Sequence, residues 1–319
     1  MAGKIVVFGG SGFIGTHLLR TLQREGHEIV SVDLKQPREV LPGVDYRIGD
    51  VRDLTKLRID GEIARIYNFA AVHTTPGHPV HDYYETNTLG AIEVTRFAAS
   101  HNVNEIIFTS SISVYGPGED MKTEETPPAP KSAYGYSKLI AERIHIAWHT
   151  AKEGRRLTVV RPAVVFGAGE GGNFTRLAKL LRKGFFVYPG RKDTIKACIY
   201  VEDLLDAIEF ARGADGQYVL FNGAYPQRYT LQQIVDTFIE HHFPSATTIM
   251  VPKGIVLGVA RLIRVLDVFN IGIHPDRVLK LVKSTDVYPA WLMEKGREYP
   301  NVIERALQKW ADESKCNFT

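Results

Sequence analysis

The sequence predicts an α/β fold: a doubly wound parallel sheet with a smaller C-terminal lobe interleaved with it. Short, continuous apolar runs recur through the first half of the chain, as in strands buried on both faces of a parallel sheet. Segments with helical periodicity separate these runs. The 319 residues, 44% hydrophobic and 24% charged, provide enough apolar surface for one large core and a second, smaller one.

The chain opens on a strand, a glycine turn and a helix. The apolar run 5–8 leads into three glycines, and helical periodicity follows them. We expect the backbone to turn sharply at Gly9, to approach a pyrophosphate closely at Gly12, and to let helix and strand pack at Gly15. The predicted phosphate-binding turn consists of Gly9, Gly12, Phe13, Ile14 and Gly15.

The second strand ends at an acidic residue, Asp33, roughly 20 residues beyond the glycines, where a carboxylate accepts hydrogen bonds from the adenosine ribose. A carboxylate there repels a 2′-phosphate, which favours NAD over NADP. Lys35 and Arg38 follow closely and keep NADP open as an alternative. Asp50, next to Val51, is interpreted either as an acceptor for the adenine amino group or as the N-cap of a helix.

A further buried strand is predicted around 65–72. Its small side chains, Ala70 and Ala71, would let a cofactor lie against the backbone. Asn87 begins the next helix. It is either a structural cap or a residue that holds backbone near the catalytic strand, and the sequence does not separate the two.

Three histidines lie in the loop after this strand: His73, His78 and His81. They suggest a metal site, but zinc ligands need a rigid scaffold, and this loop contains two prolines and no cysteine. We therefore predict no metal and a loop that faces the substrate, with His73 as a substrate contact.

The stretch 108–138 is the centre of the chain. An apolar strand ends near Ser111, prolines follow, and Tyr134 and Lys138 then lie four residues apart on one face of a helix. A phenol with a pKa of about 10 is a poor base at neutral pH, and a nearby ammonium favours its ionised form. Tyr134 is therefore a candidate acid/base for a substrate hydroxyl that Ser111 orients. A pair on an ordinary surface helix is the alternative interpretation.

The domain boundaries follow from the later segments. We predict an NAD-binding domain over 1–166, with its sheet completed by about 197–222, and a substrate-binding lobe made of 167–196 and 223–319. Ligands of such sheets bind at the carboxyl ends of the strands, so we expect the site in the cleft between the two lobes.

Composition excludes several classes of protein. A formal net charge of +3, with Lys and Arg spread along the chain, argues against nucleic-acid binding. Cys198 and Cys316 lie far apart and are expected to be free thiols in a reducing, cytoplasmic compartment. Charges interrupt the apolar stretch 254–273, so it falls short of a membrane span. We expect a core or dimer-facing helix there, with an interfacial membrane helix as the alternative.

Together these motifs resemble the extended short-chain dehydrogenase/reductase superfamily, the branch of NAD-dependent nucleotide-sugar epimerases and dehydratases. The resemblance rests on Gly9, Gly12, Gly15, Asp33, Asp50, Val51, 68–71, Ser110, Ser111, 114–116, Tyr134, Lys138, Arg161, Pro162 and 200–203. It implies a Rossmann fold and a homodimer formed through the helices after Asn87 and Tyr134. It also implies that Lys138 lowers the pKa of Tyr134 and binds the nicotinamide ribose, and we place Ser110 and Pro162 in the cofactor site.

Some positions depart from the pattern of that family. Ser111 is followed by Ile112 and Ser113, where the dehydratases need an acid, and this argues against dehydration. Lys196 stands where epimerases usually carry an arginine for the diphosphate. An asparagine usual after the arginine-proline strand is replaced around Ala163. The chain therefore also looks like the 3β-hydroxysteroid dehydrogenase and dihydroflavonol reductase branches.

The leading hypothesis is an NAD-dependent 4-epimerase of a nucleotide-diphosphate sugar. Tyr134 would take the hydroxyl proton as hydride leaves, and a transient 4-keto sugar would turn over before hydride returns. The predicted substrate contacts are His73, Ser113, Asn173, Arg191 and Lys196. The alternatives are a reductase or dehydrogenase of a keto-sugar or of a sterol-like secondary alcohol, and a non-catalytic NAD-binding regulator.

Overall fold

The computed structural model describes residues 3–74, 77–252, 254, 283–299 and 302–319, and these fall into two compact units. The first unit comprises Met1–Gly116, Glu124–Pro162 and Val201–Gly223. The second comprises Pro117–Thr123, Ala163–Tyr200 and Ala224–Thr319. The chain thus passes between the units more than once. The assignment of NAD and substrate to separate lobes stays a prediction.

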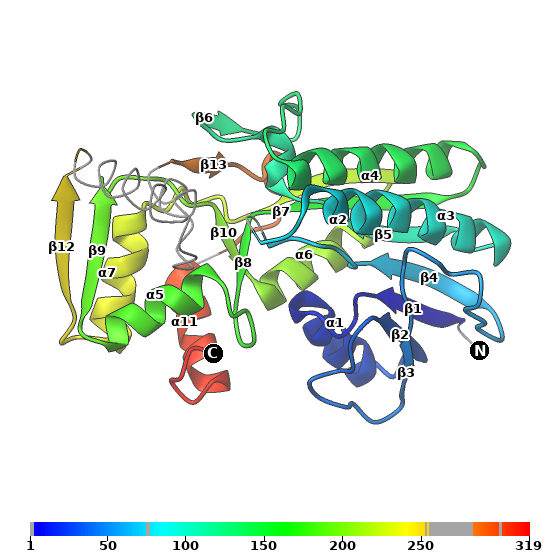
Figure 1. Cartoon of the computed structure of the whole chain (residues 1–319), viewed down its shortest axis with the longest axis horizontal. Coiled ribbons are helices and arrows are strands. Elements are labelled where there is room, and N and C mark those ends of the chain that lie inside the picture. Colours follow the sequence, from blue (N-terminus) through cyan, green and yellow to red (C-terminus); the bar gives the residue numbers. More distant parts are fainter. Residues whose placement is uncertain (1–2, 75–76, 253, 255–282, 300–301) are drawn as a thin grey trace. The chain divides into compact units, whose positions relative to one another are not determined.

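The first unit is built on a seven-stranded sheet with the strand order β11-β7-β5-β4-β1-β2-β3, and every strand pair is parallel. The strands are β1 (Lys4–Phe8), β2 (Ile29–Asp33), β3 (Val44–Ile48), β4 (Ile63–Asn68), β5 (Glu105–Thr109), β7 (Arg156–Pro162) and β11 (Tyr218–Gly223). This confirms the predicted doubly wound sheet. Its continuous apolar strands are buried because helices cover both faces (Figure 1).

The helices of the first unit are α1 (Phe13–Arg24), α2 (Val80–Tyr84), α3 (Gly90–Ser100), α4 (Ala133–Thr150) and α6 (Val201–Gly213). A π-helical segment, η1 (Glu85–Leu89), joins α2 to α3, and a short 3₁₀ helix, η2 (Ile112–Tyr115), follows β5. On one face α3 packs against α4, and on the other α1 packs against α6. Apolar side chains from α3 and α4, such as Val94 and Ala141, close the core over Phe108 and Val159.

The order of the strands reverses between β1 and β4, which lie side by side although two other strands separate them in sequence. In open parallel sheets the crevice outside the carboxyl ends at such a reversal is the usual ligand site. The predicted glycine turn follows β1 directly, and Ala70 and Ala71 follow β4. The sheet therefore brings these two predicted cofactor segments to the same edge.

In its described part, the second unit contains three two-stranded parallel sheets, β10–β8, β12–β9 and β13–β6. Its strands are β6 (Gly118–Lys122), β8 (Val164–Phe166), β9 (Phe185–Gly190), β10 (Cys198–Tyr200), β12 (Thr247–Pro252) and β13 (Thr285–Val287). Its helices among the described residues are α5 (Asn173–Arg182), α7 (Leu231–His242), α10 (Ala290–Glu294) and α11 (Val302–Glu313). Within the range 197–222, β11 completes the large sheet, whereas β10 pairs with β8 instead.

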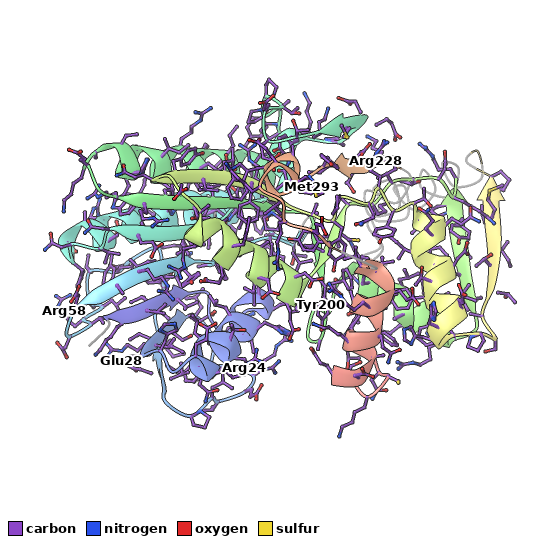
Figure 2. All side chains as sticks on the ribbon, turned by 180° about the vertical axis from the view of Figure 1, so that it is seen from behind. Arg24, Glu28, Arg58, Tyr200, Arg228 and Met293 are labelled. Carbon is purple, nitrogen blue, oxygen red and sulfur yellow. The ribbon has the colours of Figure 1, made fainter. Side chains whose placement is uncertain are left out.

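Aromatic side chains form the core of the second unit. Phe166 stacks on Phe174, and Trp310 of α11 packs edge-on against Phe238 and Phe318. The Tyr200 hydroxyl, at the end of β10, donates a 2.8 Å hydrogen bond to a carboxylate of α11, and Figure 2 shows Tyr200 beside that helix. Strand and helix are thus joined by a polar contact as well as by packing.

The predicted apolar helix at 254–273 lies, apart from its first residue, outside the described residues. In the part of the chain that the structure describes, each helix is too short or too polar to cross a bilayer.

Candidate active site

The glycine turn after β1 has the shape that a phosphate-binding turn needs. Gly9 has a positive φ of 83°, and a Cβ there would lie 2.6 Å from the backbone nitrogen of Ala70. A Cβ on Gly15 would overlap the Gly9 carbonyl oxygen, so helix and strand pack as closely as predicted. A Cβ on Gly12 would meet only that same oxygen, at 3.2 Å. The turn is tight on its inner side and open at Gly12.

No side chain of the described residues caps the N-terminus of α1 by accepting a hydrogen bond from its first backbone N–H groups. Its N-cap is Gly12, without a capping hydrogen bond, and the first helical residues, Phe13 and Ile14, are half-buried. The first backbone N–H groups of a helix have no intrahelical partner, and they carry its partial positive charge. An anion such as a pyrophosphate therefore fits here.

Asp33 ends β2 beside this turn. Its Oδ2 accepts a hydrogen bond from the Ser11 backbone N–H, and its Oδ1 accepts one from Lys35, each at 3.0 Å. A carboxylate offers about four lone-pair sites, so two remain for ribose hydroxyls. The carboxylate thus fixes the turn and still has acceptor capacity for a ligand.

Asp50 and Val51 have different surroundings. Arg52 donates to both oxygens of Asp50 and holds the pKa of that carboxyl below its usual range. No helix follows Asp50 in the described stretch up to β4, so it caps a turn rather than a helix. The role of Asp50 as an adenine acceptor stays a prediction. Val51 is 6% exposed and packs in the core, next to Gly90.

The first turn of α4 is held against η2. Ser132 caps α4 by accepting a hydrogen bond from the Gly135 N–H at 3.1 Å. Gly135 needs to be glycine, because a Cβ there would lie 2.5 Å from the Ser113 carbonyl oxygen. This close approach brings Tyr134 into hydrogen bonding with the Ser111 side chain. The structure therefore joins the two predicted catalytic residues, which are 23 positions apart in the sequence (134 − 111).

Burial raises the pKa of the Tyr134 phenol, while its hydrogen bond with Ser111 acts in the opposite direction and the nearby Tyr83 adds to the rise. Ser111 is itself fixed, because its Oγ accepts the Ser113 N–H at 3.1 Å. Tyr134 is thus a protonated phenol at neutral pH, and it needs a cation to become a base. That Lys138 is this cation stays a prediction.

Lys138 lies one turn further along α4 and is 1% exposed. Its Nζ sits over the Phe108 ring, 4.5 Å from the centroid. Burial lowers the pKa of this ammonium to about 7, and the negative charge of Glu142 opposes that shift. A buried lysine with such a pKa is typical of functional sites.

Asn87, whose role the sequence left open, holds backbone and side chains rather than capping a helix. It lies in the π-helical segment and is 3% exposed. Its amide accepts from the Val72 N–H at 2.9 Å and donates to the Val72 carbonyl at 3.1 Å and to Ser137 Oγ at 2.9 Å. It therefore ties the segment after β4 to the helix that carries Tyr134 and Lys138.

A buried polar network that the sequence did not predict joins α4 to β7 and to the residue after β5. Glu142 accepts hydrogen bonds from Arg161 Nε and Nη2 at 2.9 and 2.7 Å, and from Ser110 Oγ at 2.5 Å. Arg161 also donates to the Tyr115 hydroxyl at 2.9 Å, and that hydroxyl donates to Asn222 Oδ1 at 2.8 Å. The signal in the sequence is Arg161, which stands in an apolar strand and therefore needs an acidic partner, because buried charges are paired.

Two predicted substrate residues lie in the first unit. The pKa of His73 is lowered by burial, against a hydrogen bond with Ala71, and the charges of Lys138 and His78 lower it further. His73 therefore lies within electrostatic reach of Lys138. Ser113 lies in η2 beside Ser111. Pro162, predicted for the cofactor, is the last residue of β7.

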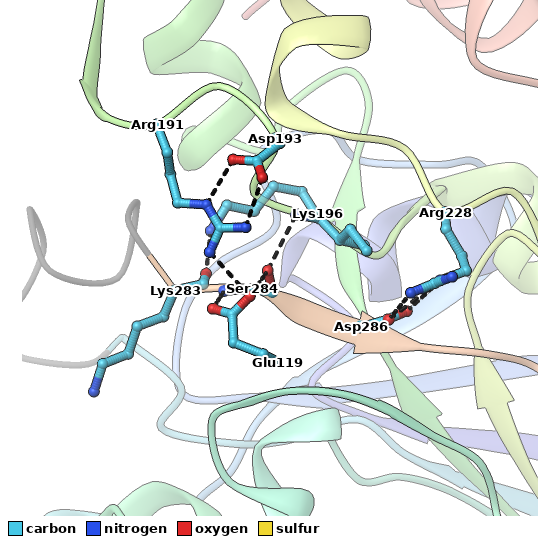
Figure 3. Close-up of polar contacts among 9 residues, drawn as sticks. Glu119, Arg191, Asp193, Lys196, Arg228, Lys283, Ser284 and Asp286 are labelled. Atoms are coloured by element: carbon cyan, nitrogen blue, oxygen red, sulfur yellow. Dashed lines mark hydrogen bonds and ion pairs between the residues drawn. The ribbon is translucent and has the colours of Figure 1, made fainter.

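The other three predicted substrate residues lie in the second unit. Asn173 is the exposed first residue of α5. Arg191 lies between two acids, with its Nε 2.7 Å from Asp193 and its Nη1 3.0 Å from Glu119 (Figure 3). Lys196 donates to the Lys283 carbonyl at 2.6 Å, and burial lowers its pKa to about 8. The structure brings Arg191 and Lys196 into one polar cluster and leaves Asn173 outside it.

The residues of the first unit fit NAD. The open turn at Gly12 and the uncapped α1 can accept a pyrophosphate, Asp33 has free acceptor sites for a ribose, and Lys138 carries a donor group one helical turn after Tyr134. Within the described part of the chain, no group of three or more His, Cys, Asp or Glu side chains could hold a metal ion.

Comparison with known proteins gives consistent results. The model of the NAD dependent epimerase/dehydratase family matches residues 5–220. An N-acetyl-alpha-D-glucosaminyl-diphospho-ditrans,octacis-undecaprenol 4-epimerase of Escherichia coli O157:H7 is 32% identical over 240 residues, which cover 74% of this chain and 71% of that protein. A UDP-glucose 4-epimerase of Lactobacillus helveticus is 30% identical over 233 residues, which cover 64% of this chain and 70% of that protein.

Solved structures share the fold over nearly the whole length. A UDP-galactose 4-epimerase superposes with a TM-score of 0.74 at 23% identity and covers 98% of both chains. A UDP-glucose 4-epimerase of Thermus thermophilus, solved in complex with NAD, superposes with a TM-score of 0.71 at 20% identity and covers 96% of this chain and 98% of that one.

Proposed function

The chain belongs to the NAD dependent epimerase/dehydratase family, and from this premise we propose that it is a 4-epimerase of a sugar carried on a nucleoside diphosphate. The observation that carries the proposal is the hydrogen bond between Ser111 and Tyr134, with the buried Lys138 one turn further along α4. The two curated relatives described above are both named as 4-epimerases of sugars on a diphosphate carrier. They differ in the carrier, which is a nucleoside in one and a polyprenol in the other.

The chain's own part in the reaction is proton transfer. Ser111 orients the sugar hydroxyl, and Tyr134 takes the proton from that oxygen and later returns it. Tyr134 must first lose its own proton to water before it can take the substrate proton, and the Lys138 ammonium favours that phenolate because an opposite charge nearby favours the ionised phenol. NAD, when bound, takes up hydride from the sugar carbon and gives it back. Because the same phenol serves both directions, the protein needs no second acid.

The diphosphate is assigned to the second unit. Arg191 and Lys196 are cations in one cluster, and a guanidinium binds phosphate oxygens in a bidentate manner. The acids that hold Arg191 are exposed, and ion pairs of exposed side chains are weak, on the order of 1 kcal/mol or less. A diphosphate can therefore displace Glu119 and Asp193 from Arg191.

We also propose a homodimer formed through α3 and α4. These two helices pack together, and they expose large apolar side chains together with the end of η1: Leu89, Ile92, Tyr136 and Ile140 are 37 to 47% exposed. Ile140→Asp is expected to convert the dimer to a monomer in size-exclusion chromatography with light scattering. The matched control is Ile249→Asp, which changes an exposed isoleucine of β12 in the second unit and should leave the mass unchanged. Equal masses for all three proteins would reject this interface.

Cytoplasmic localisation remains part of the proposal. It rests on two free thiols, Cys198 and Cys316, which are expected in a reducing compartment. Fractionation of cells that express the full chain tests it.

The test of function begins with the cofactor. Protein purified without added nucleotide is denatured, and any released NAD is measured. Native protein is then incubated, without added NAD, with UDP-sugars and separately with a polyprenyl-diphosphate sugar. Stoichiometric NAD with interconversion of the UDP-sugars supports the proposal, and Tyr134→Phe should lower that rate by about 10²- to 10⁴-fold. Turnover of the polyprenyl substrate alone would move the assignment to a lipid carrier. Turnover only with supplied NAD(H) would replace epimerisation by net redox chemistry.

A further inference from the structure

The Glu142 carboxylate and the Arg161 guanidinium form an ion pair in the interior of the first unit. Both residues are at most 4% exposed, and two parallel hydrogen bonds join the guanidinium to the carboxylate. Such a pair is not needed for stability, because the desolvation of two charges offsets most of their attraction. An apolar pair of similar size would serve packing equally well. The pair therefore invites a functional explanation.

The neighbours of the pair are the catalytic segments. Glu142 lies four residues beyond Lys138, so the two side chains share one face of α4. The third hydrogen bond of Glu142 comes from Ser110, the residue directly before Ser111. Arg161 comes from β7, the neighbour of β5 in the sheet. The carboxylate thus lies where α4, the end of β5 and β7 meet.

The charged and titratable groups that face Lys138 are few. His145, two turns further along α4, has its pKa lowered to about 4 by burial and is neutral at pH 7. His73, after β4, has a lowered pKa as well, and Tyr134 is a neutral phenol. The apolar ring of Phe108 faces the ammonium from β5. Among the described residues that act on Lys138, Glu142 supplies the negative charge.

Arg161 and Ser110 fix the position of the Glu142 carboxylate. They donate hydrogen bonds to both oxygens of Glu142 and so hold the carboxylate in place. A direct ion pair with Lys138 would take up the ammonium's donors, which the catalytic phenol and a ribose require. A carboxylate held one turn away supports the ammonium by its field instead, and burial keeps that field poorly screened.

We propose that Glu142, clamped by Arg161 and Ser110, is a positioning residue that keeps the Lys138 ammonium charged while leaving its hydrogen-bond donors free for the reaction. This inference rests on the proposed function, since it assigns Lys138 the role of the cation beside Tyr134. It gives the two members of the pair different tasks. Glu142 supplies the charge, and Arg161 keeps it at a distance.

Because the two residues have different tasks, substituting them should shift the pKa of Lys138 in opposite directions. Its titration is followed by the ¹³Cε chemical shift in lysine-labelled holoprotein, with the signal assigned by Lys138→Met. Glu142→Gln removes the charge but keeps the shape, so Lys138 should titrate about one pH unit lower. Arg161→Met frees the carboxylate to approach Lys138, which should then titrate at higher pH. Both variants should lose kcat by more than tenfold with little change in KM, and the alkaline limb of the Glu142→Gln rate profile should move to lower pH.

Two further variants keep the test decisive. The double variant Glu142→Gln/Arg161→Met leaves neither member of the ion pair buried without its partner and should fold where a single variant does not. It is expected to keep the downward shift of Lys138 and the low kcat. Glu209→Gln is the matched control, because Glu209 also accepts from a hydroxyl, Tyr67 at 2.5 Å, and from an arginine, Arg212 at 2.8 Å. It should leave the titration of Lys138 unchanged.

The outcomes separate the inference from the proposed function. If Lys138 titrates alike in the wild-type protein and in both the single Glu142→Gln and the double variant, the inference is wrong, whatever the enzyme does. If the double variant regains full kcat, the pair is structural only. If no sugar is turned over but Lys138 shifts as expected, the proposed function fails and the electrostatic arrangement stands.

Discussion

Each unit of the molecule holds an arginine between polar partners, and the two arginines lie in opposite environments. Arg161 is 4% exposed and is bound to a carboxylate that is 3% exposed. The side chain of Arg191 is 35% exposed, and its partners Glu119 and Asp193 are 57 and 73% exposed. Water screens the second cluster and not the first. The buried cluster is suited to hold one geometry, whereas the exposed one is suited to exchange its partners for those of a ligand.

The two clusters should differ most in the stability that is lost when the guanidinium is removed from each. Arg161→Met leaves the Glu142 charge buried and unpaired, and we expect a loss of about 3–5 kcal/mol in the free energy of unfolding. Arg191→Met removes exposed pairs, and the expected loss is about 1 kcal/mol or less. Urea unfolding at pH 7 measures both. Similar losses for the two variants would show that the burial of the first pair has no energetic consequence.

The two lysines extend the comparison to pH. The pKa of Lys138 falls from 10.5 to about 7 on folding, so the folded protein binds fewer protons than the unfolded one between those values. Its charge therefore destabilises the fold fully below pH 7, and that penalty fades as the pH rises toward 10.5. Lys138→Met should stabilise the protein at pH 7 by a few kcal/mol, with the gain vanishing near pH 10.5, while activity is lost. Lys196→Met should gain less, because its pKa falls only to about 8. A gain for Lys138→Met that is independent of pH would point to packing instead.

A fully buried and a partly buried histidine should differ less, in how much stability the protein loses in acid. His145 stacks on Phe108, hydrogen-bonds to Asn68 and the Ala141 carbonyl, and has its pKa lowered from 6.5 to about 4 by burial. The unfolded chain then binds the extra proton between those values, so stability falls as the pH drops from 6.5 to 4. His145→Gln should abolish about 2 kcal/mol of the loss measured between pH 7 and pH 5. His242→Gln in the second unit, where the ring is only partly buried, is the control with a weaker effect. Equal pH slopes for the wild type and His145→Gln would contradict this.

The same contrast explains what could be predicted from the sequence. The sheet, the glycine turn and the Tyr134–Lys138 pair follow from local spacing and periodicity, and so does the position of Asp33. The contacts of Glu142 and Arg161 join positions 19 residues apart through tertiary structure, and a charged residue four places after Lys138 looks like any exposed helix position. The role of Asn87 does not follow from the sequence for the same reason, because its partner Ser137 is 50 residues away. That Arg191 and Lys196 bind the substrate stays a prediction, and the acids that hold Arg191 could not be predicted because they depend on β6 and the loop after β9.

The smallest expected effect is a change of KM on substitution of Glu119. It shows whether the substrate displaces Glu119 from Arg191 or whether Glu119 holds Arg191 in position for the substrate. Glu119 accepts from Ser284 at 2.8 Å and from Arg191 at 3.0 Å, and its carboxyl is exposed. If the substrate diphosphate displaces it, Glu119→Gln should lower KM by about twofold to fivefold with kcat unchanged, which corresponds to less than about 1 kcal/mol. High salt should erase this difference because it screens exposed charges, whereas the effects of Glu142→Gln should persist at high salt because that carboxylate is buried. A rise in KM would mean that Glu119 holds Arg191 ready for the substrate, and the exposed cluster would then be as preorganised as the buried one.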